Sequence, residues 1–114
     1  MSEKGRSVRL RVADMRKSIH QIRDIVGKTD FETFKRNFVL HNSVIRDFEV
    51  LGEACKHLPA DLTDRFPAIP WQDIRDMRNL LSHEYFGVDL VIVWETATGK
   101  LDELERALEI MAGD

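Results

Sequence analysis

The sequence is poor in cysteine, proline and glycine and has no long hydrophobic run. Its 114 residues include one cysteine, three prolines and six glycines. The single Cys55 allows neither an internal disulfide nor a cysteine-based zinc site, which is typical of the reducing cytoplasm. No apolar run approaches the roughly 20 residues that cross a bilayer, and the opening MSEKGRSVRLR is too polar for a signal peptide. We therefore expect a cytoplasmic protein without a membrane anchor.

The sequence also has no large net charge. Seventeen basic and twenty acidic residues give a net charge of −3, which is not typical of a protein that coats nucleic acid. The charge is uneven, because residues 1–28 carry eight Lys or Arg against three Asp or Glu, whereas residues 89–114 carry two against seven. Two interpretations of the basic segment stay open: a solvated helix face, or a surface that attracts phosphate or an acidic partner. A basic line recurs there every seven residues at Arg9, Arg16 and Arg23.

Helical periodicity dominates the rest of the sequence. With 43% hydrophobic and 32% charged residues, the chain has the balance of one globular domain over residues 1–114. Apolar positions spaced by three and four predict helices that start near Val8, Thr29, Pro70 and Asp89. Prolines and glycines fall between these segments, and Gly99 weakens the middle of the last one. We predict an all-α fold, an up-and-down bundle of four to five helices with short connections.

The second predicted helix starts at a capping box and ends near Pro59. Thr29 and Glu32 have the spacing of that box. Gly52 lies on the apolar stripe of this helix, so we expect a neighbouring helix to approach closely there, and we expect Cys55 to be a small core side chain. The stripe consists of Phe31, Phe34, Phe38, His41, Ile45, Phe48, Gly52 and Cys55.

Polar residues gather in the third segment, where residues 75–89 read RDMRNLLSHEYFGVD. This segment is predicted to be helical from Pro70 to Gly87, with Gly87 as its C-cap. On such a helix the guanidinium, hydroxyl and phenol share one stripe, and the amide and imidazole share the next. These groups belong to Arg78, Ser82, Tyr85, Asn79 and His83.

A guanidinium beside an imidazole favours chemistry on phosphate. Arg78 can bind phosphate oxygens through two parallel hydrogen bonds, and His83 can move a proton near neutral pH. RNA supplies its own nucleophile: if His83 takes the proton of a ribose 2′-hydroxyl, that oxygen attacks the adjacent phosphorus while Arg78 stabilises the added charge. This chemistry needs no metal and no cofactor. The leaving 5′-oxygen needs an acid, which the His83 of a second copy in a symmetric dimer would supply.

The same residue types also have structural interpretations. An Arg and a His five positions apart occur by chance in many helices, and a lone Tyr85 is more often a packing residue. Arg46 and Glu49 have the spacing of an ion pair on one helix. His20 and His57 lack the spacing of metal ligands, so no metal site is predicted.

The string RNLLSHEY at residues 78–85 resembles the Arg-x4-His-x-Tyr motif of HEPN-domain proteins, specifically the HepT-like toxin group. Three further segments resemble characteristic segments of that group in the same order: IRDFEVLGEACKHL at 45–58, IPW at 69–71 and YFGVDLVIVWET at 85–96. The resemblance therefore covers nearly the whole chain.

This resemblance implies an all-α HEPN bundle that forms a homodimer, with the two motif helices meeting at a two-fold cleft. It also implies a metal-independent endoribonuclease, the toxin of a type VII-like toxin–antitoxin module. Arg78 and His83 match the catalytic pair, and Asn79 matches the polar residue that helps to arrange the site. Ser82 is expected to support them. Tyr85 matches the tyrosine to which a partner, a minimal nucleotidyltransferase antitoxin, transfers AMP.

An AMP group on Tyr85 would add a bulky anion within one or two helical turns of Arg78 and His83, where it obstructs an incoming RNA phosphate. The basic line on the first helix would guide RNA if it borders the cleft. The alternative is a non-catalytic helical subunit that binds a nucleotide or docks a nucleotidyltransferase, with Arg78 as its phosphate anchor. A helical bundle with interaction surfaces only is the third interpretation.

Overall fold

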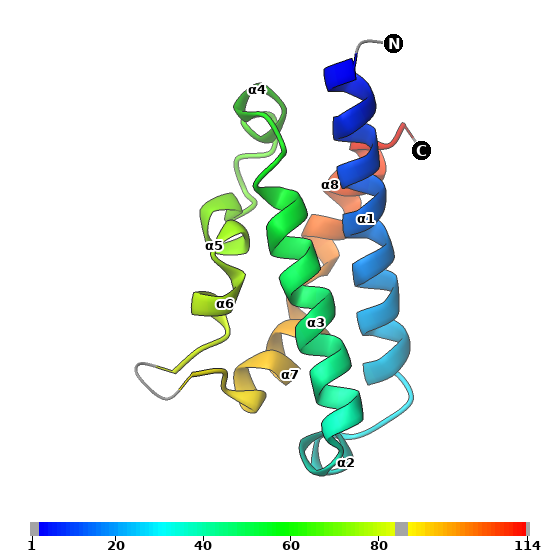
Figure 1. Cartoon of the computed structure of the whole chain (residues 1–114), viewed down its shortest axis with the longest axis vertical. Coiled ribbons are helices and arrows are strands. Elements are labelled where there is room, and N and C mark those ends of the chain that lie inside the picture. Colours follow the sequence, from blue (N-terminus) through cyan, green and yellow to red (C-terminus); the bar gives the residue numbers. More distant parts are fainter. Residues whose placement is uncertain (1–2, 84–86, 114) are drawn as a thin grey trace.

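The structure, a computed structural model, describes residues 3–83 and 87–113 and has eight helices in that part of the chain (Figure 1). Their bounds are α1 (Glu3–Val26), α2 (Phe31–Arg36), α3 (Phe38–Cys55), α4 (Ala60–Thr63), α5 (Trp71–Arg75), α6 (Met77–Leu80), α7 (Leu90–Gly99) and α8 (Asp102–Met111). Among the described residues, β-type pairing is limited to an isolated bridge between Ser82 and Val88. The predicted all-α fold is confirmed. No helix in this part of the chain is long and apolar enough to span a bilayer.

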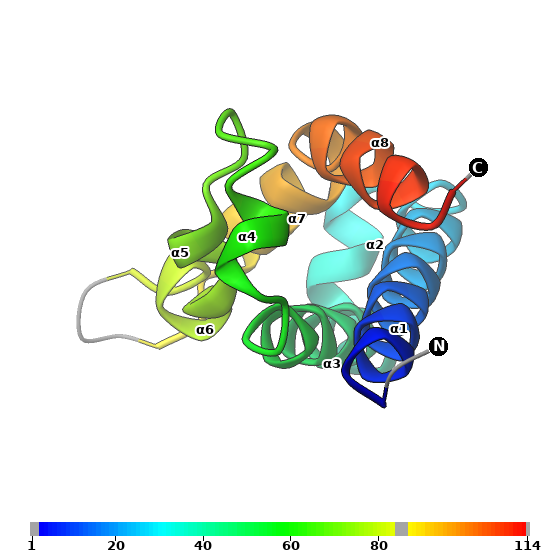
Figure 2. The same cartoon turned by 90° about the horizontal axis from the view of Figure 1, so that it is seen from above.

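The bundle is built on the antiparallel pair of α1 and α3, which pack along their length. Seen from above, α8 lies beside α1, while α5 and α6 lie on the other side of α3 (Figure 2). The predicted stripe of α1 forms its buried face, with Val12 3% exposed and Met15, Ile19 and Ile22 fully buried. The periodicity of the first segment therefore corresponds to the hydrophobic core.

The predicted second helix is divided into α2 and α3 at Asn37. The Asn37 side chain caps α3 by accepting hydrogen bonds from two backbone amides of its first turn, at 3.0 and 3.3 Å. The cap of α2 is Asp30 rather than Thr29, and the Asp30 carboxylate accepts from a backbone amide at 2.8 Å. Such caps satisfy amides that a helix start leaves free. The break places Phe38, expected within the apolar stripe, at the surface, where it is 68% exposed.

The close approach predicted at Gly52 is confirmed. A Cβ atom at Gly52 would lie 2.8 Å from the carbonyl oxygen of Ile74 and 2.9 Å from the Cβ of Met77. Between these two residues the chain leaves the helical conformation at Asp76, whose φ and ψ are −102° and 45°. The segment that carries the polar motif is therefore seated on α3 at a position that has no room for a side chain.

The prediction of a helix from Pro70 to Gly87 is wrong at its C-terminal end. Helical structure begins after Pro70, as expected, but the last helical residue is Leu80. Near this end the Ser82 hydroxyl donates a hydrogen bond of 2.6 Å to the backbone carbonyl of Arg78. A hydroxyl that binds the backbone in this way competes with continuation of the helix.

Backbone hydrogen bonds join residues 81–83 to residues 87–89. The amide of His83 donates to the carbonyl of Gly87 at 3.0 Å, and the amide of Asp89 donates to the carbonyl of Leu81 at 2.8 Å. Gly87 has a φ of +78°, a left-handed conformation that glycine adopts without steric cost. Gly87 therefore turns the chain within this loop instead of capping a long helix.

The last predicted helix begins at its expected cap and is divided near its expected weak point. The Asp89 carboxylate accepts from two backbone amides of α7, at 2.8 and 3.4 Å. α7 ends at Gly99, and α8 packs against α1, where Arg23 donates a hydrogen bond of 2.7 Å to Asp102. This bond holds the pKa of Asp102 below its ordinary value. One member of the basic line is thus paired within the bundle.

Candidate active site

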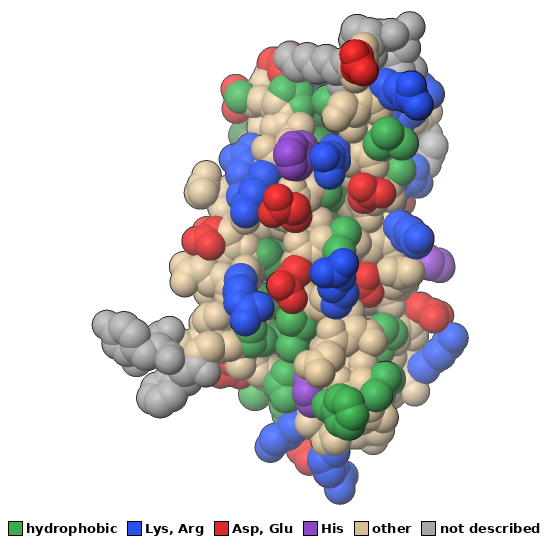
Figure 3. Space-filling model, in the orientation of Figure 1, with side chains coloured by type: hydrophobic (Ala, Val, Ile, Leu, Met, Phe, Trp, Pro, Cys, Tyr) green, Lys and Arg blue, Asp and Glu red, His purple; other side chains and the backbone are tan. Residues whose placement is uncertain are grey.

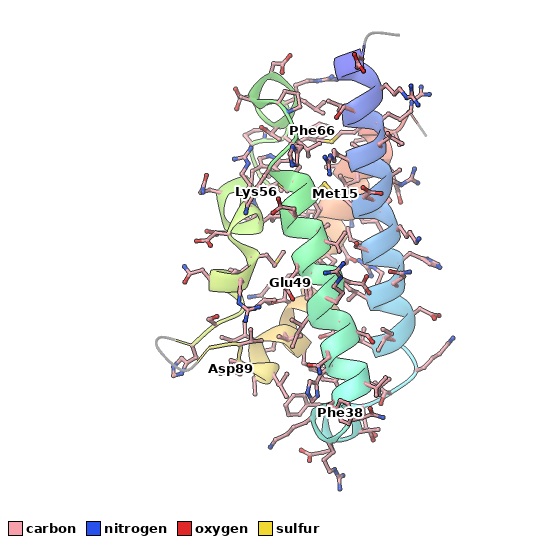
Figure 4. The ribbon with its side chains drawn as sticks, in the orientation of Figure 1. Met15, Phe38, Glu49, Lys56, Phe66 and Asp89 are labelled. Carbon is pink, nitrogen blue, oxygen red and sulfur yellow. The ribbon has the colours of Figure 1, made fainter. Side chains whose placement is uncertain are left out.

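Arg78 projects from α6 over the neighbouring helix α3. Its side chain is 70% exposed, and its Nη1 atom lies 3.5 Å from Oε2 of Glu49. Glu49, labelled in Figure 4, was expected to pair with Arg46 on its own helix, but its ion pair in the described structure joins α3 to α6. Exposed pairs contribute little to stability. The consequence of this pair is that a carboxylate occupies the Arg78 guanidinium when no other anion is bound.

Asn79 and Ser82 differ in their surroundings. Asn79 is exposed on α6 next to Arg78, where its amide is accessible from solvent. Ser82 is half-buried, and its hydroxyl donates to the Arg78 carbonyl. Ser82 therefore ties the loop to the backbone that carries Arg78, which is compatible with the supporting role predicted for it.

His83 is exposed on the loop after α6 and lines a pocket of about 290 Å³. Aromatic contacts brace this pocket, because Phe31 of α2 and Trp94 of α7 meet edge to face with ring centroids 6.0 Å apart. The ring centroids of Phe34 and the same Trp94 lie 5.1 Å apart. The other residues of the pocket are Lys35, Gly87, Val88, Asp89, Leu90 and Val91.

Arg78 lines a different pocket, of about 460 Å³, between α1, α3 and the α5–α6 segment. Within one copy of the chain, the guanidinium and the imidazole therefore border two separate hollows. The predicted helical stripes are wrong for His83, because the helix ends at Leu80 before reaching it. The prediction for Tyr85 lies outside the described residues.

Two other candidate side chains, Cys55 and His41, lie in structural surroundings. Cys55 is fully buried, and burial raises the pKa of its thiol to about 11, so it is a core residue as predicted. His41 lies with its Nδ1 3.0 Å from the carbonyl oxygen of Phe34, at the junction of α2 and α3. Among the described residues, no group of three or more His, Cys, Asp or Glu side chains is placed to hold a metal ion.

Sequence reasoning missed the charged lining of the pocket beside Arg78. Four of these residues follow one another at spacings of three and four: Arg46, Glu49 and Glu53 of α3, and its C-cap residue Lys56. That spacing places them on one face of a helix. The signal was therefore present in the sequence as a polar stripe next to the apolar one, about 100° around the helix.

Comparison with known proteins identifies the family. The model of the family described as Ribonuclease HepT-like matches residues 15–111, which include α6 and the loop after it. A protein of Methanocaldococcus jannaschii named "Putative RNase" is 40% identical over 94 residues, 80% of this chain and 81% of the relative. A "Putative RNase" of Caldanaerobacter subterraneus is 40% identical over 79 residues, 69% of this chain and 70% of the relative.

The protein of Thermococcus cleftensis named "Probable ribonuclease HepT" is 34% identical over 96 residues, 84% of this chain and 87% of the relative. No solved structure matches the sequence. The family match spans most of the chain, and the chain is all-helical over its described residues. The chain therefore belongs to the HepT-like ribonuclease family of HEPN-domain proteins.

Proposed function

We propose that this protein is a cytoplasmic, metal-independent endoribonuclease and the toxin of a type VII-like toxin–antitoxin module. The observation that carries the proposal is the placement of Arg78 and His83 in a chain of this family. Arg78 lies on the single turn of α6 and His83 three residues after its end, and both side chains are exposed. A guanidinium and an imidazole that are both accessible to a phosphodiester suit transesterification of RNA.

In the proposed reaction, the imidazole of His83 accepts the proton of a ribose 2′-hydroxyl. The 2′-oxygen then forms a bond to the adjacent phosphorus, and the bond from phosphorus to the 5′-oxygen breaks. The imidazolium of His83 in a second copy gives its proton to the leaving 5′-oxygen. Arg78 binds the phosphate oxygens and stabilises the charge of the transition state. The products are a 2′,3′-cyclic phosphate and a 5′-hydroxyl.

A homodimer is part of this proposal, and exposed apolar side chains near the motif support it. Phe38 is 68% exposed, Val91 48% and Leu80 38%. They lie at the start of α3, the start of α7 and the end of α6. Phe38 and Asp89, both labelled in Figure 4, lie at the same end of the molecule. A second copy that covers these side chains would bring two motif segments together, so that Arg78 and His83 of both copies border one cleft.

Tyr85 is the proposed control point. By resemblance, a minimal nucleotidyltransferase antitoxin transfers AMP to its hydroxyl, and the phosphate of that group then competes for Arg78 and blocks the cleft. Incubation with this antitoxin and ATP should add the mass of AMP to the wild type and not to Tyr85→Phe. Equal labelling of the variant would place the modification on another residue.

The ribonuclease proposal is tested with purified wild type, His83→Ala and His20→Ala on total cellular RNA. His20 is an exposed histidine on α1, so its variant controls for the loss of a surface imidazole. We expect cleavage by the wild type and by His20→Ala, and none by His83→Ala. Equal cleavage by all three proteins would reject His83 as the proton carrier.

A second candidate function is RNA or nucleotide binding without cleavage. The specific observation in its favour is that Arg78 and His83 line separate pockets in one copy, while Glu49 holds the Arg78 guanidinium. Under this alternative, a wild type with unmodified Tyr85 binds RNA but leaves it intact. The same cleavage assay therefore separates the two functions, provided that mass spectrometry establishes the state of Tyr85.

A further inference from the structure

The pocket that contains Arg78 extends along α3 as an open, charged groove, which we call the α3 groove. Figure 3 shows this face of the molecule, on which basic and acidic side chains alternate. Glu49 and Lys56, labelled in Figure 4, lie along α3 on the same face. The charged residues of the groove are Arg11, Asp14, Arg46, Glu49, Glu53, Lys56, Arg75, Asp76 and Arg78.

Part of this charge is already paired. Glu49 pairs with Arg78 at 3.5 Å, and Lys56 donates a hydrogen bond of 3.2 Å to Glu53. The remaining charged residues of the groove are three arginines and two aspartates: Arg11, Arg46, Arg75, Asp14 and Asp76.

Two of the three remaining arginines are partly withdrawn from solvent. Arg11 on α1 and Arg75 on α5 are half-buried, whereas Arg46 on α3 is exposed. A guanidinium that is partly desolvated attracts an anion more strongly than one surrounded by water. The groove thus presents guanidinium groups from three elements toward one space, with Arg78 among its lining residues.

We propose that the α3 groove binds the RNA backbone next to the scissile phosphate, an inference that rests on the proposed ribonuclease function. Arginine pairs with phosphate oxygens, and the interspersed carboxylates accept hydrogen bonds from 2′-hydroxyls and base amino groups. Arg46, Arg75 and Arg11 are positioning residues in this proposal, because they hold phosphates on which no bond is made or broken.

The groove is long enough for more than one phosphate of an RNA strand. From Arg46 to Lys56, the C-cap residue of α3, the axial rise is about 15 Å, at roughly 1.5 Å per residue. Phosphates of one strand follow one another at about 3.4 Å along a helix axis, so the groove has room for more than one. A single nucleotide would leave part of this lining without a ligand.

The α3 groove lies on a different side of α1 from the predicted basic line. Arg23, one member of that line, pairs with Asp102 and lies 3.6 Å from Glu105 on α8. Arg11 follows Arg9 of the line by two residues, which turns it about 200° around the helix axis. The RNA path is therefore assigned to the side of α1 that faces α3, and not to the line at Arg9, Arg16 and Arg23.

Binding is measured first, with a fluorescent 2′-O-methyl RNA oligonucleotide, which lacks the nucleophile and cannot be cleaved by the proposed reaction. Arg46→Ala and Arg75→Ala should each weaken binding by roughly threefold to tenfold, the range expected for one charged interaction at a partly exposed site. The logarithm of the association constant decreases as the logarithm of the salt concentration rises. The magnitude of this slope should decrease by about one for each phosphate that the variant no longer binds.

Arg65→Ala is the matched control, because Arg65 is an exposed arginine of the 59–70 connector outside the groove. It should bind with the wild-type affinity and salt slope. Circular dichroism establishes that each variant is folded, and the exposed Arg46 provides a second test, Arg46→Glu, if Arg75→Ala is unstable. Groove variants that bind like the wild type would overturn the proposal.

Cleavage then separates this proposal from the ribonuclease function. Arg46→Ala should raise KM for an oligonucleotide at unchanged kcat and should leave kcat/KM for a dinucleotide unchanged, because a dinucleotide holds only the scissile phosphate. If the wild type cleaves RNA but Arg46→Ala does not distinguish the oligonucleotide from the dinucleotide, the groove proposal is rejected and the ribonuclease function is retained. If the wild type never cleaves RNA but the groove variants lose binding of the 2′-O-methyl RNA, the groove proposal is retained and the ribonuclease function is rejected.

Discussion

At the scale of the residue, the ion pair of Glu49 and Arg78 means that a phosphate must compete with a carboxylate for the Arg78 guanidinium. The two side chains are 43% and 70% exposed, so water screens their attraction. A phosphate can therefore displace the carboxylate at small cost. Until then the carboxylate neutralises the guanidinium and repels incoming anions.

Replacement of Glu49 by Gln is expected to strengthen binding of the 2′-O-methyl RNA by roughly threefold, because one negative charge beside Arg78 is removed. The free energy of unfolding should change by no more than about 0.5 kcal/mol. Fluorescence anisotropy and urea titration measure the two effects. Glu109→Gln on α8, also exposed, is the control and should change neither. Weaker binding by Glu49→Gln would show that the carboxylate positions Arg78 for RNA instead of competing with it.

Burial of Cys55 predicts a pH dependence of stability. Its thiol pKa is raised from an ordinary 9.0 to about 11, so between these values the unfolded chain releases a proton that the folded chain keeps. The free energy of unfolding should therefore fall as pH rises from 9 to 11. In urea titrations across this range, the fall should be steeper for the wild type than for Cys55→Ala. Parallel curves would contradict the shielded thiol.

At the scale of the element, the seat of the α5–α6 segment on α3 fixes the position of Arg78. Gly52→Ala would place a methyl group 2.8 Å from the Ile74 carbonyl oxygen, a backbone atom that cannot turn aside. We expect a decrease of about 1 to 3 kcal/mol in the free energy of unfolding. Gly99→Ala, where no atom lies within 4 Å, is the matched control and should be neutral or slightly stabilising. Equal stability of the two variants would contradict the close approach of the two elements.

The helices and the weak point at Gly99 could be predicted from the sequence, whereas the break at Asn37 and the early end of α6 could not. Spacings of three and four identify a buried face because burial of apolar side chains is the dominant driving force. The break at Asn37 depends on a side chain that binds two backbone amides, and the end of α6 at Leu80 is accompanied by a Ser82 hydroxyl bonded to the backbone. Hydrogen bonds from these side chains to the backbone can end a helix without changing the spacing of the apolar residues. The spacing therefore does not show where the helix ends.

The residues of the candidate site were proposed from the sequence, whereas their arrangement in space could not be predicted. Arg78 and His83 were identified from residue types and from the family motif, and both are exposed as a site requires. Their separation into two pockets follows from the loop after Leu80, which the helical pattern did not indicate. The α3 groove was missed because its residues come from four helices, α1, α3, α5 and α6, and one sequence does not state which elements meet.

At the scale of the whole molecule, the proposed site is completed by a second copy. Phe38→Glu should convert the proposed dimer to a monomer and abolish RNA cleavage, because a carboxylate cannot be buried in an apolar interface without large cost. The fold should persist, since Phe38 is already 68% exposed. Analytical ultracentrifugation and circular dichroism measure these effects. Ile110→Glu, on α8 and 59% exposed, is the control that should remain dimeric. A Phe38→Glu monomer with full activity would contradict a shared cleft.

The central claim is that His83 drives metal-free transesterification of RNA. The most direct measurement is the chemistry of the ends produced from a defined RNA oligonucleotide in EDTA, with wild type and His83→Ala compared side by side. The account predicts 2′,3′-cyclic phosphate and 5′-hydroxyl ends from the wild type and intact RNA with His83→Ala. Ends with a 3′-hydroxyl and a 5′-phosphate, or the same products from both proteins, would contradict it.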